Sequence, residues 1–513
     1  MTGVAPGSPV GVVGAGTMGA GIAEVAARAG HPVRLLDAAP GAGQRAVEAL
    51  RDRLAKDVGK GRLEQTDADD VARRVEVVDA VAALAGCALV VEAVAERLEV
   101  KRSLFAELEA VLDDGAVLAT NTSSLSVTAV AAGLRHPGRV VGLHFFNPAP
   151  RMRLVEVVRG EDTDPAVVEA ATDLARAWGK TPVTCTSTPG FIVNRVARPF
   201  YGEAQRMVSE GVADPATIDA ILRECGGFPM GPFELTDLVG QDVNLAVSRS
   251  VWEQTFGDPR YAPTVFQQRL VDAGRLGRKT ARGVFDYHEG ADGARPAVAA
   301  QPARPAPARV RRTPHGWGPM EPFLGRVRGV AIETVDDHED HHVLAGIHLP
   351  GDGVLMPTDG RRASSWSGQA VGGVVLIDWM HDPSSCARVA LAASPGCRDG
   401  VLEAAVGFCQ AAGVSVSVVT DRAGMVVART VSMLVNEAVE LVTRGEAEAE
   451  DVDVAMRLGT GYPSGPLEWG DVLGPEAVEG VVDELRAASP SGRYRPSPAL
   501  EDALLSGRSL RDL

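Results

Sequence analysis

A strand, a glycine-rich turn, a helix and a second strand follow one another near the N-terminus, and this order constrains the fold most strongly. The segment reads VGVVGAGTMGAGIAEVAARAGHPVRLLD and covers residues 10–37. The first glycine of such a segment permits a tight turn, the second lets a pyrophosphate approach the backbone, and the third lets the helix lie close to the strand. Free N–H groups at the helix N-terminus bind the phosphates. The residues expected to contact a dinucleotide are Gly14, Gly16, Thr17, Met18 and Gly19.

The acidic residue at the end of the second strand indicates which dinucleotide binds. Asp37 lies where a carboxylate accepts hydrogen bonds from the adenosine ribose and repels a 2′-phosphate. The sequence therefore predicts NAD, rather than NADP, as the cofactor.

Short apolar runs alternate with helical periodicity from residue 10 to residue 158. Strands are expected at 10–13, 33–36, 75–78, 88–91, 117–119, 140–143 and 154–157. Helices are expected at 18–29, 44–58 and 100–112. This alternation predicts a mostly parallel sheet with helices on both faces. From about residue 189 the strand pattern stops and amphipathic helices follow.

The last hundred residues contain an internal repeat. Residues 190–240 align without a gap with residues 424–474, so that FPMGPFELTDLVG matches YPSGPLEWGDVLG. The helical domain is therefore expected twice. Asn194 corresponds to Ala428 in the second copy, and residues 321–420 contain neither a GxGxxG nor an HFFNP motif. One active site is therefore expected.

The expected fold is an α/β Rossmann-type dinucleotide-binding domain followed by an all-α domain, then a degenerate α/β segment and a second copy of the all-α domain. At 513 residues the chain is too long for one core. A Pro/Ala/Arg-rich stretch separates the halves and is expected to be a linker. The expected boundaries are 8–187, 188–288, 289–319 for the linker, 320–421 and 422–513.

Charge and composition exclude several classes of partner and location. The net charge of −16 argues against nucleic acid and anionic membranes as partners. No apolar run reaches the roughly 18 residues of a membrane span, and the N-terminus lacks a signal-peptide pattern. The six cysteines are scattered, as is typical of reduced thiols in the cytoplasm. The polar run DDHEDHH at 336–342 is interpreted as a solvated loop, so no metal is expected.

A histidine and a glutamate in neighbouring apolar runs are the candidate catalytic pair. His144 ends the run RVVGLHFF, and Glu156 lies inside RLVEVV. A buried glutamate in a valine-rich strand is costly unless it is paired, and an imidazole partner satisfies it. Two adjacent strand ends would bring the side chains together, giving a general base oriented by a carboxylate.

A polar loop follows the apolar run at 117–119. Ser123 lies in the sequence NTSSL, where open α/β folds bind ligands at the carboxyl ends of strands. The alternative is that this loop caps the next helix, a role that Ser124 or Ser126 could fill.

Six motifs together resemble the 3-hydroxyacyl-CoA dehydrogenase family. GAGTMGAGIA, VVEAVAE, NTSSL, HFFNPAPRMRLVE, TPGFIVNR and GFPMGPFELTDLVG occur in the order and spacing of that family. The resemblance is specific over residues 10–288 and weaker over the second helical copy. Its longer forms resemble bacterial enzymes of phenylacetate and short-chain acyl-CoA breakdown, and the family also serves fatty acid β-oxidation.

The resemblance implies a role for each matching residue. His144 would take the proton of the C3 hydroxyl, with Glu156 as its orienting partner. Ser123 and Asn194 would hydrogen-bond the reacting oxygen or a nearby carbonyl. Further residues that would contact the cofactor are Glu96, Lys101, Ser123, Asn147 and Lys279.

The same resemblance assigns coenzyme A contacts to the helix after Asp37. Lys56 fits the family's CoA-contacting lysine, with Lys60 as an alternative. Ala49 stands where some relatives have a serine. The expected activity is NAD-dependent oxidation of (S)-3-hydroxyacyl-CoA to 3-oxoacyl-CoA.

Two other functions and two assemblies remain open at the level of sequence. The alternatives are a dehydrogenase of free hydroxy acids or sugar acids with the same His–Glu pair, and a non-catalytic NAD-binding protein. The helical domains are expected to form either a homodimer or a pseudo-dimer within one chain.

Overall fold

The apolar runs of the first 190 residues form one sheet in the computed structural model, which describes residues 4–288, 298–335 and 344–513. Within the described chain this sheet has eight strands in the order β3-β2-β1-β4-β5-β6-β7-β8, and only the β6–β7 pair is antiparallel. Its strands are β1 (Val10–Val13), β2 (Val33–Leu36), β3 (Val75–Val78), β4 (Leu89–Glu92), β5 (Val117–Thr120), β6 (Val140–Phe145), β7 (Leu154–Arg159) and β8 (Thr181–Thr186). The mostly parallel sheet expected from the sequence is confirmed.

Helices cover this sheet because its central strands are apolar on both faces. Every residue of β1, β4 and β5 is buried. The helices of this domain are α1 (Thr17–Arg28), α2 (Ala42–Gly59), α3 (Gln65–Arg73), α4 (Leu98–Val111), α5 (Val127–Ala131), α6 (Pro165–Ala177) and α7 (Val193–Val196).

The sequence pattern did not predict strand β8, which lies at the edge of the sheet. Its sequence TPVTCT alternates, and only Val183 and Cys185 are buried. A short edge strand needs one apolar face only, so its signal is weak. Residues 445–460, with α16 (Ala449–Thr460), pack on β8 and β7 and belong to the same compact unit as residues 1–195.

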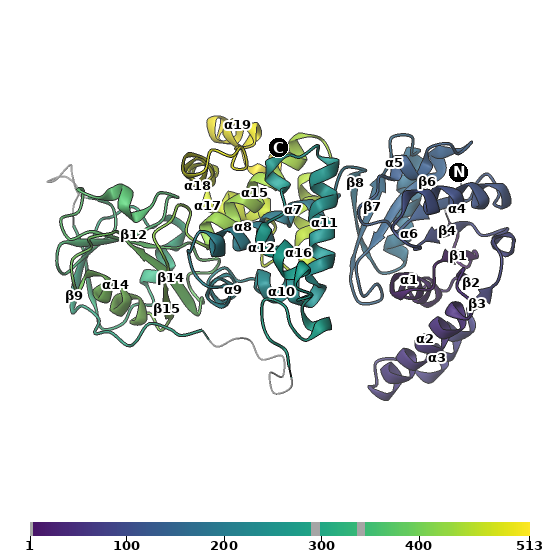
Figure 1. Ribbon diagram of the computed structural model, residues 1–513, viewed down its shortest axis with the longest axis horizontal. Helices are drawn as coiled ribbons and strands as arrows, with labels where there is room; N and C mark the ends of the chain where they lie inside the picture. The colour runs from purple at the N-terminus through teal and green to yellow at the C-terminus, as the bar shows by residue number, and fades with distance from the viewer. Residues whose placement is uncertain (1–3, 289–297, 336–343) are drawn as a thin grey trace. The chain divides into compact units, whose positions relative to one another are not determined.

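The second compact unit comprises residues 196–444 and 461–513 and holds the first helical copy, the second copy apart from α16, and the second sheet (Figure 1). The first copy consists of α8 (Arg198–Ser209), α9 (Pro215–Glu224), α10 (Pro232–Val239), α11 (Gln241–Gln254) and α12 (Val265–Asp272). The second copy begins with α15 (Val427–Thr443) and ends with α17 (Pro466–Leu473), α18 (Pro475–Ala488) and α19 (Pro498–Ser506).

The middle segment forms a mixed sheet of seven strands within its described residues, in the order β10-β9-β11-β12-β13-β14-β15. These are β9 (Arg309–Arg312), β10 (Ala331–Thr334), β11 (Ile347–Leu349), β12 (Gly353–Pro357), β13 (Val374–Ile377), β14 (Arg388–Ala393) and β15 (Ser415–Val418). The helices of the segment are α13 (Glu321–Leu324) and α14 (Val401–Gln410).

The expected linker at 289–319 is wrong in its C-terminal part. β9 lies inside it and pairs with β10 and β11. Val310 and Trp317 are buried, so this stretch contributes to a hydrophobic core. Its arginine- and proline-rich composition did not predict this. The polar run at 336–342 lies outside the described residues.

The two helical copies pack on each other through α8 and α15. Arg429 of α15 is buried and bonds to Glu203 at 2.8 Å and Glu210 at 2.6 Å. The hydroxyl of Tyr494 donates to Glu203 at 2.8 Å, and that of Tyr261 donates to Glu437. Glu203 and Glu437 occupy the same position of the repeat, so the contact is made twice with the copies exchanged.

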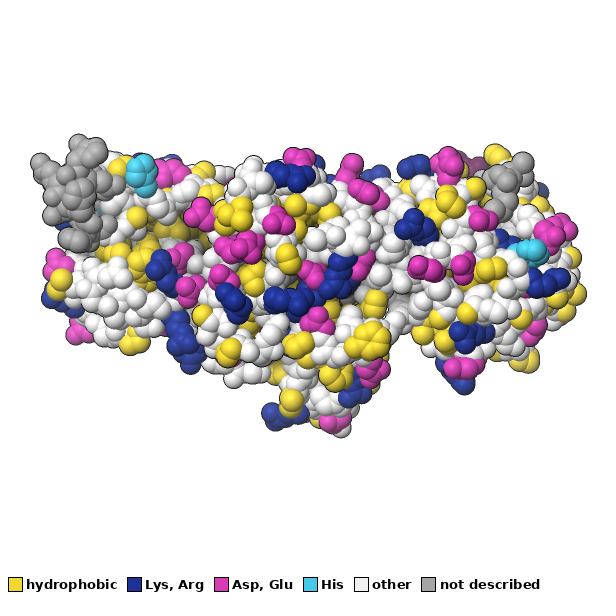
Figure 2. Space-filling model, turned by 90° about the horizontal axis from the view of Figure 1, so that it is seen from above, with side chains coloured by type: hydrophobic (Ala, Val, Ile, Leu, Met, Phe, Trp, Pro, Cys, Tyr) yellow, Lys and Arg dark blue, Asp and Glu magenta, His cyan; other side chains and the backbone are white. Residues whose placement is uncertain are grey.

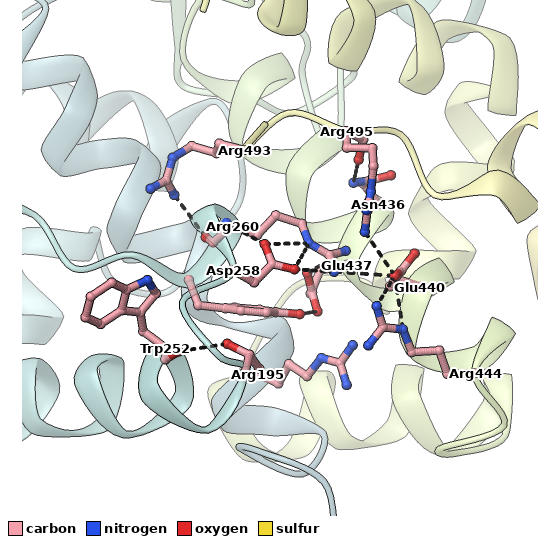
Figure 3. A network of polar contacts seen from close by, with 12 residues as sticks. Arg195, Trp252, Asp258, Arg260, Asn436, Glu437, Glu440, Arg444, Arg493 and Arg495 are labelled. Atoms are coloured by element: carbon pink, nitrogen blue, oxygen red, sulfur yellow. Dashed lines mark hydrogen bonds and ion pairs between the residues drawn. The ribbon is translucent and has the colours of Figure 1, made fainter. Parts of the chain in front are cut away.

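A second buried network joins the copies beside these tyrosines, as Figure 3 shows. Arg260 contacts Asp258 at 2.9 Å in its own copy and Glu440 at 3.4 Å in the other. Glu437 lies 3.9 Å from the same guanidinium. Because paired charges in the interior need such partners, this network favours one alignment of the two copies.

Acidic and basic side chains are interspersed over the face drawn in Figure 2, so the negative net charge is not gathered into one patch there. Within the described residues, no helix combines the length and apolarity that a membrane span requires.

Candidate active site

The glycine turn between β1 and α1 has the shape that a pyrophosphate requires. A Cβ on Gly19 would lie 1.7 Å from the carbonyl oxygen of Gly14, so a side chain there would separate the helix from the strand. A Cβ on Gly16, in contrast, would meet no described atom within 4 Å. The backbone is therefore close-packed behind the turn and open in front of it, which fits NAD.

A cleft of about 870 Å³ opens beside this turn. Asp37 lies in it, with its carboxylate accepting from the amides of Ala15 at 2.6 Å and Ala39 at 2.8 Å. These bonds hold the carboxylate at the end of β2, where an adenosine ribose would bind. The cleft is also lined by the cationic residues Arg28, Arg45, Arg53, Lys56, Lys60 and Arg151.

The antiparallel register of β6 and β7 places His144 directly opposite Glu156. The imidazole Nδ1 lies 2.6 Å from Glu156 Oε2, and both side chains are buried. Because a carboxylate only accepts hydrogen bonds, this contact places a ring proton on Nδ1 and leaves the lone pair on Nε2, which can accept a proton. Phe146 and Phe191 flank the ring at centroid distances of 4.6 and 5.9 Å.

The other oxygen of Glu156 holds the segment that contains Asn194. Oε1 accepts from the amides of Ile192 at 3.1 Å and Val193 at 2.9 Å. The Asn194 side-chain amide donates to the carbonyl of Ser123 at 3.3 Å. One carboxylate thus links the imidazole to the segment 192–194, and the structure brings His144, Glu156, Asn194 and Ser123 together through contacting residues.

Glu96 organises the loop that contains Ser123. Its Oε1 accepts from the amides of Ser123 at 2.9 Å and Ser124 at 3.1 Å, and from the Thr122 hydroxyl at 2.6 Å. Burial would raise the pKa of Glu96, but Lys101 and these hydrogen bonds together hold it below its ordinary value. Ser126 caps α5 by accepting from an amide three residues later, so the capping role falls to Ser126 rather than Ser123.

Three predicted cofactor residues differ in their surroundings. Lys101 is only 1% exposed, and its ammonium contacts Glu92 at 2.7 Å and Glu96 at 3.1 Å. It therefore lies beneath the Glu96 loop. Asn147 is exposed at the end of β6. Lys279 belongs to the second compact unit, where it pairs with Asp242 at 2.5 Å.

Sequence reasoning assigned no role to three residues that support the site. The Asn121 side chain accepts from the amide of Phe145 at 2.8 Å and so fixes the end of β6 next to His144. Glu92 is the buried partner of Lys101. Lys180 donates to the carbonyls of Ala149 and Met152 and holds the loop beside the cleft. The motif VVEAVAE contained the signal for Glu92, whereas Lys180 depends on contacts distant in sequence.

The second half keeps the contact that anchors residues 192 and 193 but not the pair of His144 and Glu156. Asp378, directly after β13, accepts from the amides of Val426 at 2.9 Å and Val427 at 2.7 Å. These two residues are the repeat counterparts of Ile192 and Val193. The Asp378 amide donates to the carbonyl of Ala390 on the neighbouring antiparallel strand. Asp378 therefore takes the place of His144, and Ala390 takes the place of Glu156. An aspartate facing an alanine thus replaces a histidine facing a glutamate.

Comparison with known protein families agrees with this layout. Residues 9–188 match the 3-hydroxyacyl-CoA dehydrogenase NAD binding domain, and residues 190–287 and 424–512 both match the family's C-terminal domain. Residues 355–422 match the 3-hydroxybutyryl-CoA dehydrogenase reduced Rossmann-fold domain. The duplication inferred from the sequence is thereby confirmed.

Similar proteins extend over the whole chain. A 3-hydroxyadipyl-CoA dehydrogenase of Escherichia coli is 42% identical over 97% of this chain and 97% of its own length. A probable 3-hydroxybutyryl-CoA dehydrogenase of Bacillus subtilis is 40% identical over 54% of this chain and 96% of its own length. A crystal structure of 3-hydroxybutyryl-CoA dehydrogenase from Escherichia coli covers 98% of this chain and 99% of its own, at 42% identity and a TM-score of 0.88. The chain therefore belongs to the 3-hydroxyacyl-CoA dehydrogenase family and is an NAD-dependent oxidoreductase of 3-hydroxyacyl-CoA.

Proposed function

We propose that His144 is the general base that removes the C3 hydroxyl proton, and that Glu156 orients its ring and stabilises the imidazolium formed. Bound NAD would supply the hydride acceptor. The contact of 2.6 Å between buried imidazole and carboxylate is the observation that carries this proposal. Asn194 and Ser123 would hydrogen-bond the substrate oxygens, so that the hydroxyl is held at Nε2 while its proton departs.

NAD would be held by the glycine turn, Asp37 and the Glu96 loop. We infer that Lys101 acts through Glu96, since its ammonium is enclosed by two carboxylates. The substrate class we propose is a short-chain or dicarboxylic 3-hydroxyacyl-CoA. The two full-length relatives support this class, because their names specify 3-hydroxyadipyl-CoA and 3-hydroxybutyryl-CoA.

Initial rates with NADH test the substrate class. We expect kcat/KM for acetoacetyl-CoA to exceed that for free acetoacetate by at least about 100-fold, because remote binding energy from coenzyme A contributes to catalysis. Comparable values for the two would favour a dehydrogenase of free hydroxy acids. No turnover of either, with NADH still bound, would favour a non-catalytic NAD-binding protein. A series of 3-oxoacyl-CoA substrates then defines the chain length.

The cationic side of the cleft would hold the phosphates of coenzyme A through Lys56, with Lys60 nearby. We expect Lys56→Met to raise KM for acetoacetyl-CoA roughly threefold to tenfold, since one charge-assisted contact contributes about 1–2 kcal/mol. The value of kcat should not change, because the contact is the same in ground and transition states. Arg51→Met on the same helix is the control, because Arg51 is exposed and lies outside the cleft lining. Equal KM values in both variants would contradict the assignment.

We propose one active site and an intrachain pseudo-dimer. The pairing of Tyr261 with Glu437 and of Tyr494 with Glu203 supports the pseudo-dimer, since exchanged contacts are typical of two-fold symmetric dimers. Asp378 facing Ala390 supports a single site.

Sizing of residues 1–288 alone tests the pseudo-dimer: we expect a dimer or an aggregating species, and a fully active monomer would refute it. We also propose a cytoplasmic location, which the six free cysteines support, because thiols stay reduced in that compartment.

A further inference from the structure

A segment of the second helical copy contacts the active-site domain next to Asn194. The amide of Thr186 at the end of β8 donates to the carbonyl of Glu446 at 2.8 Å, and the amide of Thr184 donates to the Asp451 side chain at 2.8 Å. Gly459 of α16 comes so close that an added Cβ would lie 3.0 Å from Val193. The edge of the first sheet is therefore completed by residues distant in sequence.

The side chain of Glu446 contacts the segment 188–195, which contains Asn194. It accepts a hydrogen bond from the hydroxyl of Thr188 at 3.0 Å and forms an ion pair with Arg195, which is 2% exposed. Thr188 and Arg195 bracket the segment TPGFIVNR, which ends with Asn194 and Arg195. Glu156 holds the same segment through the amides of Ile192 and Val193. Two carboxylates thus fix the backbone that presents Asn194, one of them from the far end of the chain.

Comparison of the two repeats shows that the contact made by the Glu446 side chain has no counterpart at Val212, the equivalent position of the other copy. In the second unit the amide of Thr420 donates to the carbonyl of Val212 at 3.0 Å, the counterpart of the bond between Thr186 and Glu446. The backbone contact is therefore shared, whereas the side chain is Val in one copy and Glu in the other.

Arg195 also differs from its repeat counterpart in the acidic partner that it uses. Arg429 pairs with Glu210 of the opposite copy. The counterpart of Glu210 is Arg444, which cannot accept a hydrogen bond from Arg195. Glu446, two residues further on, provides the carboxylate instead. The two halves thus differ at the contact that reaches the catalytic segment.

We propose that Glu446 is a positioning residue of the active site, through which the second helical copy holds Asn194 in place. This inference rests on the proposed role of Asn194 in binding substrate oxygen. Val at position 446 would keep the backbone bond to Thr186, as Val212 does with Thr420, and would remove only the side-chain contacts. The second helical copy then positions a substrate-binding residue, in addition to packing against the first copy.

The test compares variants of the full-length chain. We expect Glu446→Val to lower kcat with acetoacetyl-CoA and NADH about tenfold and Glu446→Gln, which keeps an acceptor, by less, since small displacements of a catalytic group cost this much. NADH affinity and binding stoichiometry should not change, because the glycine turn is remote from position 446 in sequence and contact. Glu448→Gln, exposed at the start of the same segment, is the matched control.

A double-mutant cycle separates positioning from a merely structural role. In an Asn194→Ala background, Glu446→Val should lower kcat by less than about twofold, because both changes remove the same interaction with substrate. Additive losses, wild-type kcat in Glu446→Val, or a fall in NADH binding stoichiometry would overturn the inference.

Amide hydrogen exchange gives a readout independent of turnover: peptides covering 186–195 should exchange faster in Glu446→Val. If the wild type fails to reduce acetoacetyl-CoA, the proposed function fails, while unchanged exchange would reject the role of Glu446.

Discussion

Replacing His144 by Gln is expected to lower kcat by about 10²–10⁴-fold, the usual contribution of a positioned general base. Gln approximates the size of the imidazole and can still hydrogen-bond Glu156, but it cannot take up the hydroxyl proton. NADH affinity should remain within about twofold of the wild type, because the glycine turn and the Asp37 carboxylate make no contact with position 144. Steady-state rates with acetoacetyl-CoA and NADH, together with NADH fluorescence titration, measure both quantities.

His136→Gln is the matched control, since that imidazole is exposed and lies 3.9 Å from Asp114 at the surface. Near-normal turnover in His144→Gln would refute its role as base. Adding Glu156→Gln to His144→Gln should cost little more activity, because residues that act as a unit show non-additive losses. A full additional loss in the double variant would mean that Glu156 acts mainly by anchoring Ile192 and Val193.

The largest expected change in stability follows from Arg429→Met. Removing this guanidinium leaves the buried Glu203 with Arg206, 3.5 Å away, as its one cationic partner among the described residues. Breaking a buried ion pair in this way typically lowers the free energy of unfolding by about 3–5 kcal/mol. The denaturation midpoint of the second unit, followed by tryptophan fluorescence in urea, reports the loss.

The effect of Arg429→Met should depend on pH in a defined direction. Burial alone would raise the pKa of Glu203, but Arg206 and Arg429 outweigh it and hold the pKa below its ordinary value. A carboxyl with a lowered folded-state pKa stabilises the protein above its unfolded pKa, and this stabilisation is lost as pH falls through the folded value. The difference between wild type and variant should therefore be largest at neutral pH and shrink in acid.

Arg486→Met provides the comparison for that measurement. Arg486 is 58% exposed and pairs with Asp483 at 2.9 Å on the surface of α18. Exposed pairs contribute only about 0–1 kcal/mol, so this variant should unfold close to the wild type. Equal midpoints for the Arg429 and Arg486 variants would show that the contact between the helical copies does not depend on the buried pair.

Much of the first domain could be predicted because its signals are local. Strand β1, the glycine turn and Asp37 follow one another within 28 residues, and the β6–β7 register that joins His144 to Glu156 needs only two adjacent antiparallel strands. β8 and β9 escaped prediction because one is a half-buried edge strand and the other is arginine-rich. Their stability comes from neighbours, which a sequence window does not include.

The amino-acid sequence was sufficient to predict the nucleotide-binding fold, the pairing of His144 with Glu156 and the duplicated helical domain, and it shows that residues 321–420 lack the GxGxxG and HFFNP motifs of the first half. Those conclusions depend on periodicity and spacing, which are properties of neighbouring residues. Only the tertiary structure decided that Lys101 lies enclosed between Glu92 and Glu96, that Asp378 keeps the anchoring contact without the histidine, and that Glu446 reaches Arg195 across 251 positions. Burial and ion pairing depend on which distant side chains share an interior, and packing alone determines that.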